Sequence, residues 1–168
     1  MTATSPPTSR QLPPAAMYTA FAALTLAVAA LGATVSGGES DPWYAALDKA
    51  PGTPPGWVFG VVWPILYALM AISACLAWRA ASPRERASVI AIYVAQLFVN
   101  LAWSCLFFGL HQPATAFADI AVLLSLTIWM AYAFGAHSRI AGLLQVPYIL
   151  WLCFAGYLNA WIVFTGQS

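Results

Sequence analysis

The chain has 168 residues, of which 62% are hydrophobic and only 7% are charged, and its formal net charge is +1. Soluble domains carry about 25% charged residues, so this composition excludes an ordinary soluble protein and indicates an integral membrane protein. A nucleic-acid partner is excluded as well, because phosphate binding requires clustered Lys and Arg.

Five apolar stretches are long enough to cross a bilayer, which takes about 20 residues of helix. They lie at residues 16–37, 57–79, 87–110, 114–135 and 140–165. Their continuous apolarity differs from the alternating pattern of membrane barrel strands. We therefore predict an all-α membrane protein, a bundle of five transmembrane helices with a long, structured first loop.

The segment before the first span, residues 1–15, is rich in Pro, Ser and Thr, so we expect a disordered tail followed by one transmembrane domain at 16–168. The first span is longer than the apolar core of a signal peptide, and only Arg10 precedes it, which favours an uncleaved helix. If the helices alternate in direction, all the arginines share one side and Lys49 lies on the other. The positive-inside rule then places the amino terminus in the cytoplasm.

The loop at residues 38–56 has an aromatic, proline-rich composition that is unlike a flexible linker. Asp41 followed by Pro42 is a helix start signal, so we expect a short helical turn that carries Trp43 and Tyr44. Prolines further along stiffen the return to the second span. Such a loop suits two roles, a lid over the open end of the bundle or an aromatic belt that anchors the loop at the membrane interface.

One face of the third span combines amides with aromatic rings at helical spacing. Amides are costly in hydrocarbon without partners, so this face points into the bundle. The amides either join helices by hydrogen bonds, worth about 0.6–2 kcal/mol each, or contact a bound group. Matching stripes follow on the second and fifth spans. The three faces consist of Tyr93, Gln96, Asn100, Trp103 and Phe107; Gly60, Trp63, Tyr67 and Met70; and Tyr148, Trp151, Ala155 and Asn159.

Conventional catalytic and metal-binding patterns do not occur in the sequence. The three cysteines fall in separate spans, and His111 and His137 fall in turns on opposite sides, so we expect no metal site. There is no phosphate-binding glycine loop and no serine nucleophile elbow. Asp119 is the one acid inside a predicted span; it is either a functional group or a side chain that reaches interfacial water.

Four motifs, in the first loop and in the second, third and fifth spans, carry a family resemblance. They are Trp43-Tyr44-x-x-Leu47-x-Lys49; Pro54-Pro55-x-Trp57-Val58-x-Gly60-x-x-Trp63-x-x-Leu66-Tyr67; Gln96-Leu97-x-x-Asn100-x-x-Trp103 with Phe107-Phe108-Gly109; and Pro147-Tyr148-x-x-Trp151-x-x-Phe154-Ala155-x-x-Leu158-Asn159. In these motifs the chain resembles the TspO/MBR family, the tryptophan-rich sensory proteins and translocator proteins, also called peripheral benzodiazepine receptors.

The resemblance implies tilted helices in the lipid bilayer, a homodimer, and a ligand cavity closed by the first loop. Family members bind porphyrins such as protoporphyrin IX, so it implies a membrane receptor or sensor for flat tetrapyrrole ligands that has no resident cofactor. The ligand-binding residues it implies are Trp43, Tyr44, Pro55, Phe59, Trp63, Gln96, Asn100, Trp103, Phe107, Pro147, Trp151 and Ala155.

Two other functions stay open from the resemblance. Some bacterial relatives degrade protoporphyrin in light and oxygen with two cavity tryptophans that match Trp63 and Trp151, which makes these the candidate catalytic residues. The other alternative is a transporter of tetrapyrroles or lipids. The alanine-rich chain has no basic amphipathic targeting peptide, so we expect a bacterial membrane.

The chain departs from the family pattern at three places. Lys49-Ala50-Pro51-Gly52 stands where the family often has Lys-Pro-x-Trp, so we expect a lid that grips less tightly. Residues 160–164 lack the Tyr and basic residue of the weak sterol pattern, which argues against cholesterol recognition there. Thr115 stands where animal relatives have a cavity tryptophan, which argues against tight drug binding.

Overall fold

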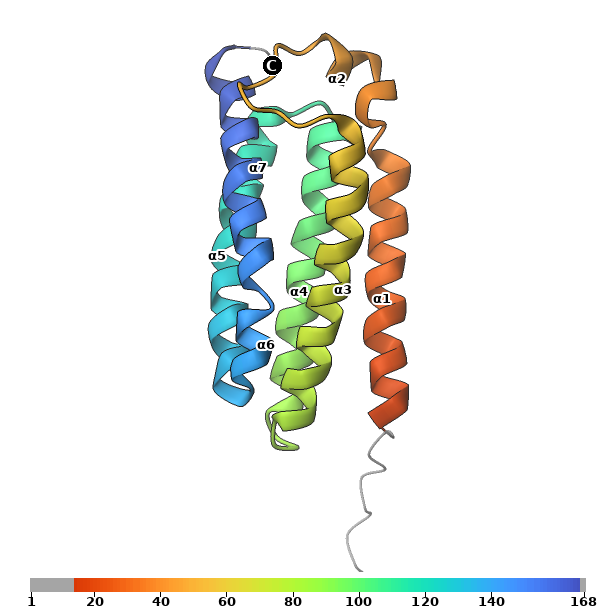
Figure 1. Ribbon diagram of the computed structural model, residues 1–168, viewed down its shortest axis with the longest axis vertical. Helices are drawn as coiled ribbons and strands as arrows, with labels where there is room; N and C mark the ends of the chain where they lie inside the picture. The colour runs from red at the N-terminus through yellow and green to blue at the C-terminus, as the bar shows by residue number, and fades with distance from the viewer. Residues whose placement is uncertain (1–13, 167–168) are drawn as a thin grey trace, which may run out of the picture.

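The structure is a computed structural model, and it describes residues 14–166. Within these residues, five helical segments are long and apolar enough to cross a membrane (Figure 1). They are Pro14–Val35 (α1), Gly56–Ala80 (α3), Arg86–Gly109 (α4 and η2), Pro113–His137 (α5) and Arg139–Phe164 (α6 and α7). The predicted all-α membrane fold is confirmed.

The first helix begins earlier than the sequence predicts. α1 starts at Pro14, and Pro14 and Ala15 therefore belong to the helix and not to the expected tail at residues 1–15. The rest of the expected tail, residues 1–13, lies outside the described residues.

The third span changes its winding before it ends. α4 runs over Arg86–Ser104 and continues into a π-helical segment, η2, at Cys105–Gly109. The backbone N–H of Leu110 donates to the oxygen of Cys105, five residues earlier, at 2.9 Å. π-Helical turns rotate the following side chains relative to an α-helix and often occur at functional sites. Apolar periodicity alone does not predict this change.

The fifth span is divided into two helices, where the sequence predicts one at residues 140–165. α6 covers Arg139–Leu143 and α7 covers Val146–Phe164, with Pro147 in the first turn of α7. In a continuous helix the residue at 147 would donate its N–H to the carbonyl of Leu143, and proline has no N–H to donate. The chain therefore turns at residues 144–145 and starts a new helix.

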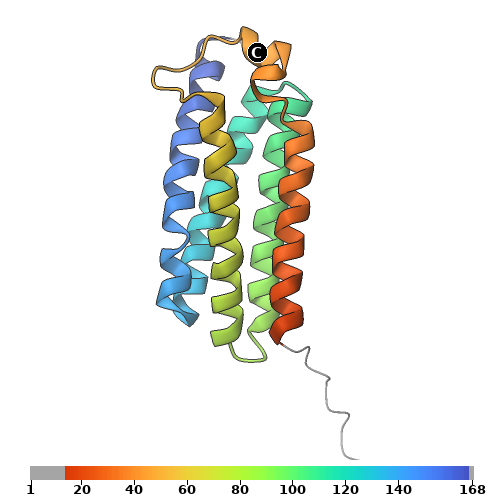
Figure 2. The same cartoon turned by 45° about the vertical axis from the view of Figure 1, so that its right-hand side comes forward.

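The helices pack around a large apolar core, and a second, smaller cluster at Phe107, Ala116 and Ile162 lies against the first loop. α5 packs against α4, α6 and α7, and α1 packs against α3 and α4. Fully buried side chains at the centre include Met70, Tyr93, Met130, Phe134 and Tyr148. The first loop (residues 36–55) and the end of α7 lie at one end of the bundle, and α6 and the α3–α4 turn lie at the other (Figures 1 and 2).

Candidate ligand cavity

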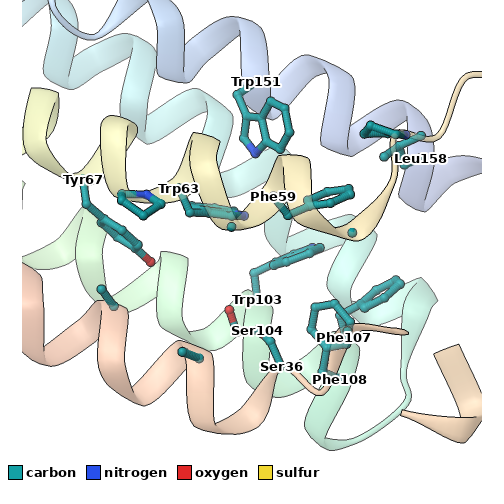
Figure 3. Close-up of a pocket in the computed structure, with 18 of the residues that line it drawn as sticks. Ser36, Phe59, Trp63, Tyr67, Trp103, Ser104, Phe107, Phe108, Trp151 and Leu158 are labelled. Carbon is teal, nitrogen blue, oxygen red and sulfur yellow. The ribbon is translucent and has the colours of Figure 1, made fainter. Parts of the chain in front are cut away.

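A cavity of about 740 Å³ lies under the first loop, among side chains of α1, α3, α4, η2 and α7 (Figure 3). Binding sites for small molecules have volumes of about 300–1,000 Å³ and mostly apolar walls. This cavity has both properties, because nearly all its wall is made of small aliphatic and aromatic side chains. Lys49 is the one charged residue among the described residues that line it.

Three tryptophans from three different helices form its walls. Trp63 comes from α3, Trp103 from α4 and Trp151 from α7. Figure 3 shows these indoles around one space, beside Phe59 and Phe107. Phe59 contacts Trp151 edge-on at 5.5 Å between ring centroids, and Trp103 stacks on Phe107 at 5.3 Å. The cavity therefore presents flat π surfaces from several sides.

The first loop contains a short helix that rests on η2. α2 spans Pro42–Ala46, and the Asp41 carboxylate accepts a hydrogen bond at 2.9 Å from the backbone N–H of Trp43, which confirms the predicted start signal. Tyr44 contacts Phe107 at 6.2 Å and Phe108 at 5.5 Å between centroids, and it lines the cavity. These contacts pack the loop against η2 at the end of the cavity.

A second contact joins the loop to the chain just after η2. The Trp43 indole stacks on the His111 imidazole at 4.4 Å with an interplanar angle of 14°. His111 Nε2 also lies 3.4 Å from Asp41 Oδ2, so one carboxylate both caps α2 and approaches the imidazole. His111 has a left-handed backbone with φ of 51°. Trp43 therefore fixes the loop from outside the cavity.

The amides of the third span form a buried hydrogen-bond network. Asn100 Nδ2 donates to Tyr148 Oη at 2.7 Å, and Gln96 Nε2 donates to the same oxygen at 3.2 Å. Asn100 Oδ1 accepts from Tyr67 Oη at 2.7 Å. Tyr67 lines the cavity, whereas Gln96 and Asn100 lie behind it. The network joins α3, α4 and α7 and holds one wall residue in place.

The twelve expected ligand-binding residues divide into two groups of six. Those on the cavity wall are Tyr44, Phe59, Trp63, Trp103, Phe107 and Trp151. Those elsewhere are Trp43, Pro55, Gln96, Asn100, Pro147 and Ala155. Pro55 is the residue before α3, Pro147 forms the first turn of α7, and Ala155 packs against the core instead of facing the cavity.

Several wall residues were not singled out from the sequence, above all those of α1. They are small or aliphatic side chains, at Ala22, Thr25, Leu26, Ala29, Gly32, Ala33 and Ser36. They recur along one side of α1, but small residues are common in apolar spans, so this spacing alone does not mark a cavity wall. Asn159 of α7, by contrast, was on the inward face predicted for the fifth span, and it lines the cavity; it accepts from Trp103 Nε1 at 3.3 Å and donates to the carbonyl of Pro113 at 2.8 Å.

The remaining candidate groups lie away from the cavity. Asp119 is in α5 and is not part of the wall. His111 follows η2 near the first loop, and His137 ends α5 at the opposite end of the bundle. The site thus contains aromatic, amide and hydroxyl groups around apolar space, with one ammonium group at the loop.

Comparison with known proteins gives the same family over most of the chain. The TspO/MBR family model matches residues 21–164. The translocator protein of Bos taurus is 36% identical over 131 residues, which cover 77% of this chain and 78% of that protein. Protein CrtK of Rhodobacter capsulatus is 38% identical over 154 residues, covering 89% and 96%. The tryptophan-rich sensory protein of Cereibacter sphaeroides is 36% identical over 144 residues, covering 86% and 87%.

Two of these names refer to translocation and to sensing, and none of the three names an enzymatic activity. The five apolar helices and the family make the chain a multi-pass integral membrane protein, with bacterial proteins among its relatives. The chain belongs to the TspO/MBR family.

Proposed function

We propose that this protein is a membrane receptor for porphyrins and related flat tetrapyrroles, which it binds in the cavity under the first loop. The observation that carries the proposal is the wall formed by Trp63, Trp103 and Trp151 around about 740 Å³ of apolar space. Aromatic rings stack favourably on other flat rings, with centroids about 4.5–7 Å apart. A macrocycle is the ligand shape that uses all three surfaces.

The position of the cavity supports the same proposal. Porphyrins are poorly soluble in water and partition into membranes, and the wall includes exposed apolar residues of the membrane-spanning helices α1 and α3, such as Leu26 and Pro64. The apolar wall argues against a wide aqueous pore. Binding, rather than conduction, is therefore the activity that the site supports best.

The proposal is tested by titrating the purified protein with protoporphyrin IX in the dark while following tryptophan fluorescence. We expect saturable quenching, because three wall tryptophans would contact the ligand. Gly60 lines the cavity, and a Cβ added there meets no heavy atom within 4 Å. A side chain at this position therefore starts in open cavity space, and we expect the indole of Gly60→Trp to occupy part of the cavity and to weaken binding more than tenfold.

The matched control is Val61→Trp, which adds the same indole one residue later in α3, at an exposed position off the cavity wall. We expect this variant to bind as the wild type does. Absence of saturable quenching in the wild type would overturn the proposal. Equal affinity in Gly60→Trp and Val61→Trp would show that the ligand binds somewhere other than this cavity.

Light-driven porphyrin breakdown is a second candidate function, and one observation favours it. Trp63 and Trp151 both lie on the cavity wall, so a bound macrocycle would have two indoles close to it. A photoexcited porphyrin can pass its energy to dioxygen or take an electron from an indole. Under illumination in air, catalysis requires more than one equivalent of product per protein, and Trp63→Phe and Trp151→Phe should each reduce the rate. Consumption of only one equivalent of porphyrin per protein would count against an enzyme.

A further inference from the structure

The cavity has one cationic group on a wall that is otherwise uncharged among the described residues. Lys49 belongs to the first loop, between α2 and α3, and it is half-buried. Its ammonium nitrogen lies 4.9 Å from the centroid of the Tyr44 ring, which also lines the cavity. The cation–π contact holds the ammonium group against the cavity wall.

The location of Lys49 gives the charge a specific use. The loop lies outside the two spans that it joins, Pro14–Val35 and Gly56–Ala80, and so at the water-facing end of the cavity. A carboxylate is too costly to place in the apolar interior without a partner, but it remains partly hydrated at this end. A ligand with an apolar flat body and an acidic edge would place its body among the tryptophans and its acid beside Lys49.

We propose that Lys49 is the anchor for a ligand carboxylate, so that the cavity selects flat amphipathic acids over their neutral analogues. This inference rests on the proposed function and makes it more specific: the ligand class is a tetrapyrrole whose acidic side chains point toward the first loop. The ammonium group donates charge-assisted hydrogen bonds to the carboxylate, which are stronger than bonds between neutral groups. Lys49 is a binding residue in this scheme and takes part in no chemical step.

The test compares protoporphyrin IX, which has two propionic acid groups, with its dimethyl ester, in the wild type, Lys49→Met and Lys49→Arg. Methionine keeps a long unbranched side chain but has no charge, and arginine keeps the charge. In the dark, we expect the wild type and Lys49→Arg to prefer the acid over the ester about tenfold, and Lys49→Met to lose this preference. High salt should reduce the preference, because it screens a half-exposed pair.

The outcomes separate the two proposals. If the wild type binds the acid and the ester equally well, or if Lys49→Met keeps the acid preference, the anchor is refuted while porphyrin binding stands. If the wild type binds neither porphyrin, the proposed function fails, and pyrenebutyric acid and its methyl ester serve as smaller flat probes of the same cavity. An acid preference for pyrenebutyrate that disappears in Lys49→Met supports the anchor; no preference, or no binding of either pyrene, refutes it.

Discussion

The buried network behind the cavity predicts a large loss of stability when a single oxygen is removed. Tyr148 is completely buried, and its hydroxyl oxygen accepts hydrogen bonds from Asn100 and Gln96. Tyr148→Phe leaves both amide donors in the core without this acceptor. Interhelical hydrogen bonds in membranes are worth about 0.6–2 kcal/mol each. The loss of two therefore lowers the free energy of unfolding by about 1–4 kcal/mol.

The assay is unfolding of the purified protein in detergent, followed by circular dichroism. The matched control is Tyr132→Phe, which removes the same oxygen from a side chain of α5 that is 84% exposed. An exposed substitution of this kind changes stability by less than about 0.5 kcal/mol. If Tyr148→Phe is as stable as Tyr132→Phe, the network does not hold the helices together and the reasoning is wrong.

The same network connects stability to the cavity wall. Tyr67 donates to Asn100, and Asn100 donates to Tyr148, so the two tyrosines share one amide. Tyr67→Phe should cost less than Tyr148→Phe, because it removes one bond instead of two. The double variant should cost less than the sum of the single variants, because the partner they share is already disturbed. Strict additivity would show that the two bonds are independent.

Three other predictions concern the ends of the bundle. Asp41→Ala removes the cap of α2 and the contact with His111, so the loop should open about fivefold more often, measured as the rate of tryptic cleavage after Lys49. Asp41→Asn retains a capping oxygen and should increase the cleavage rate less. Equal cleavage rates in the wild type and both variants would contradict the docking of the loop. Hydrogen bonds from the Ser82 hydroxyl and backbone N–H lower the pKa of Glu85 below its ordinary value of 4.5. The ionised Glu85 carboxylate therefore stabilises the fold above pH 4.5, and this contribution is lost as the pH falls through the folded-state pKa. Glu85→Gln should flatten this part of the acid unfolding curve, and an unchanged curve would refute the assignment. A Cβ at Gly142 would lie 2.8 Å from a backbone oxygen of α5, so Gly142→Ala should destabilise the protein by about 1–3 kcal/mol in thermal unfolding. In the control Gly60→Ala the added Cβ meets open space, so this variant should keep the stability of the wild type. Equal stability of the two variants would contradict the packing of α6 on α5.

Hydropathy was sufficient to predict the membrane fold, because each span is a long apolar run that has to satisfy its own backbone hydrogen bonds in lipid. Hydropathy did not predict changes of helix type or breaks in the helix within a single apolar run. The π-helical turn at η2 and the break before α7 leave the apolar composition unchanged. Pro147 is a visible signal for the break, whereas no residue type marks the change of winding at η2.

The candidate site was only partly predictable for a geometric reason. Helical spacing identifies the inward face of a helix, and this face includes both the cavity wall and the core behind it. Trp103 and Asn100 lie on the same predicted face, yet only Trp103 lines the cavity. α1 has no aromatic stripe, so its contribution depends on small side chains such as Ala29 and Gly32, which stand out only when the opposite helices are known.

The central claim is that a flat macrocycle binds between the three tryptophans of the cavity, and an experimental structure of the protein with protoporphyrin IX bound in the dark tests it most directly. The account predicts density for one macrocycle among Trp63, Trp103 and Trp151, under the first loop. Density for the porphyrin on the outer surface of the bundle, with the cavity empty or filled by lipid, would contradict it.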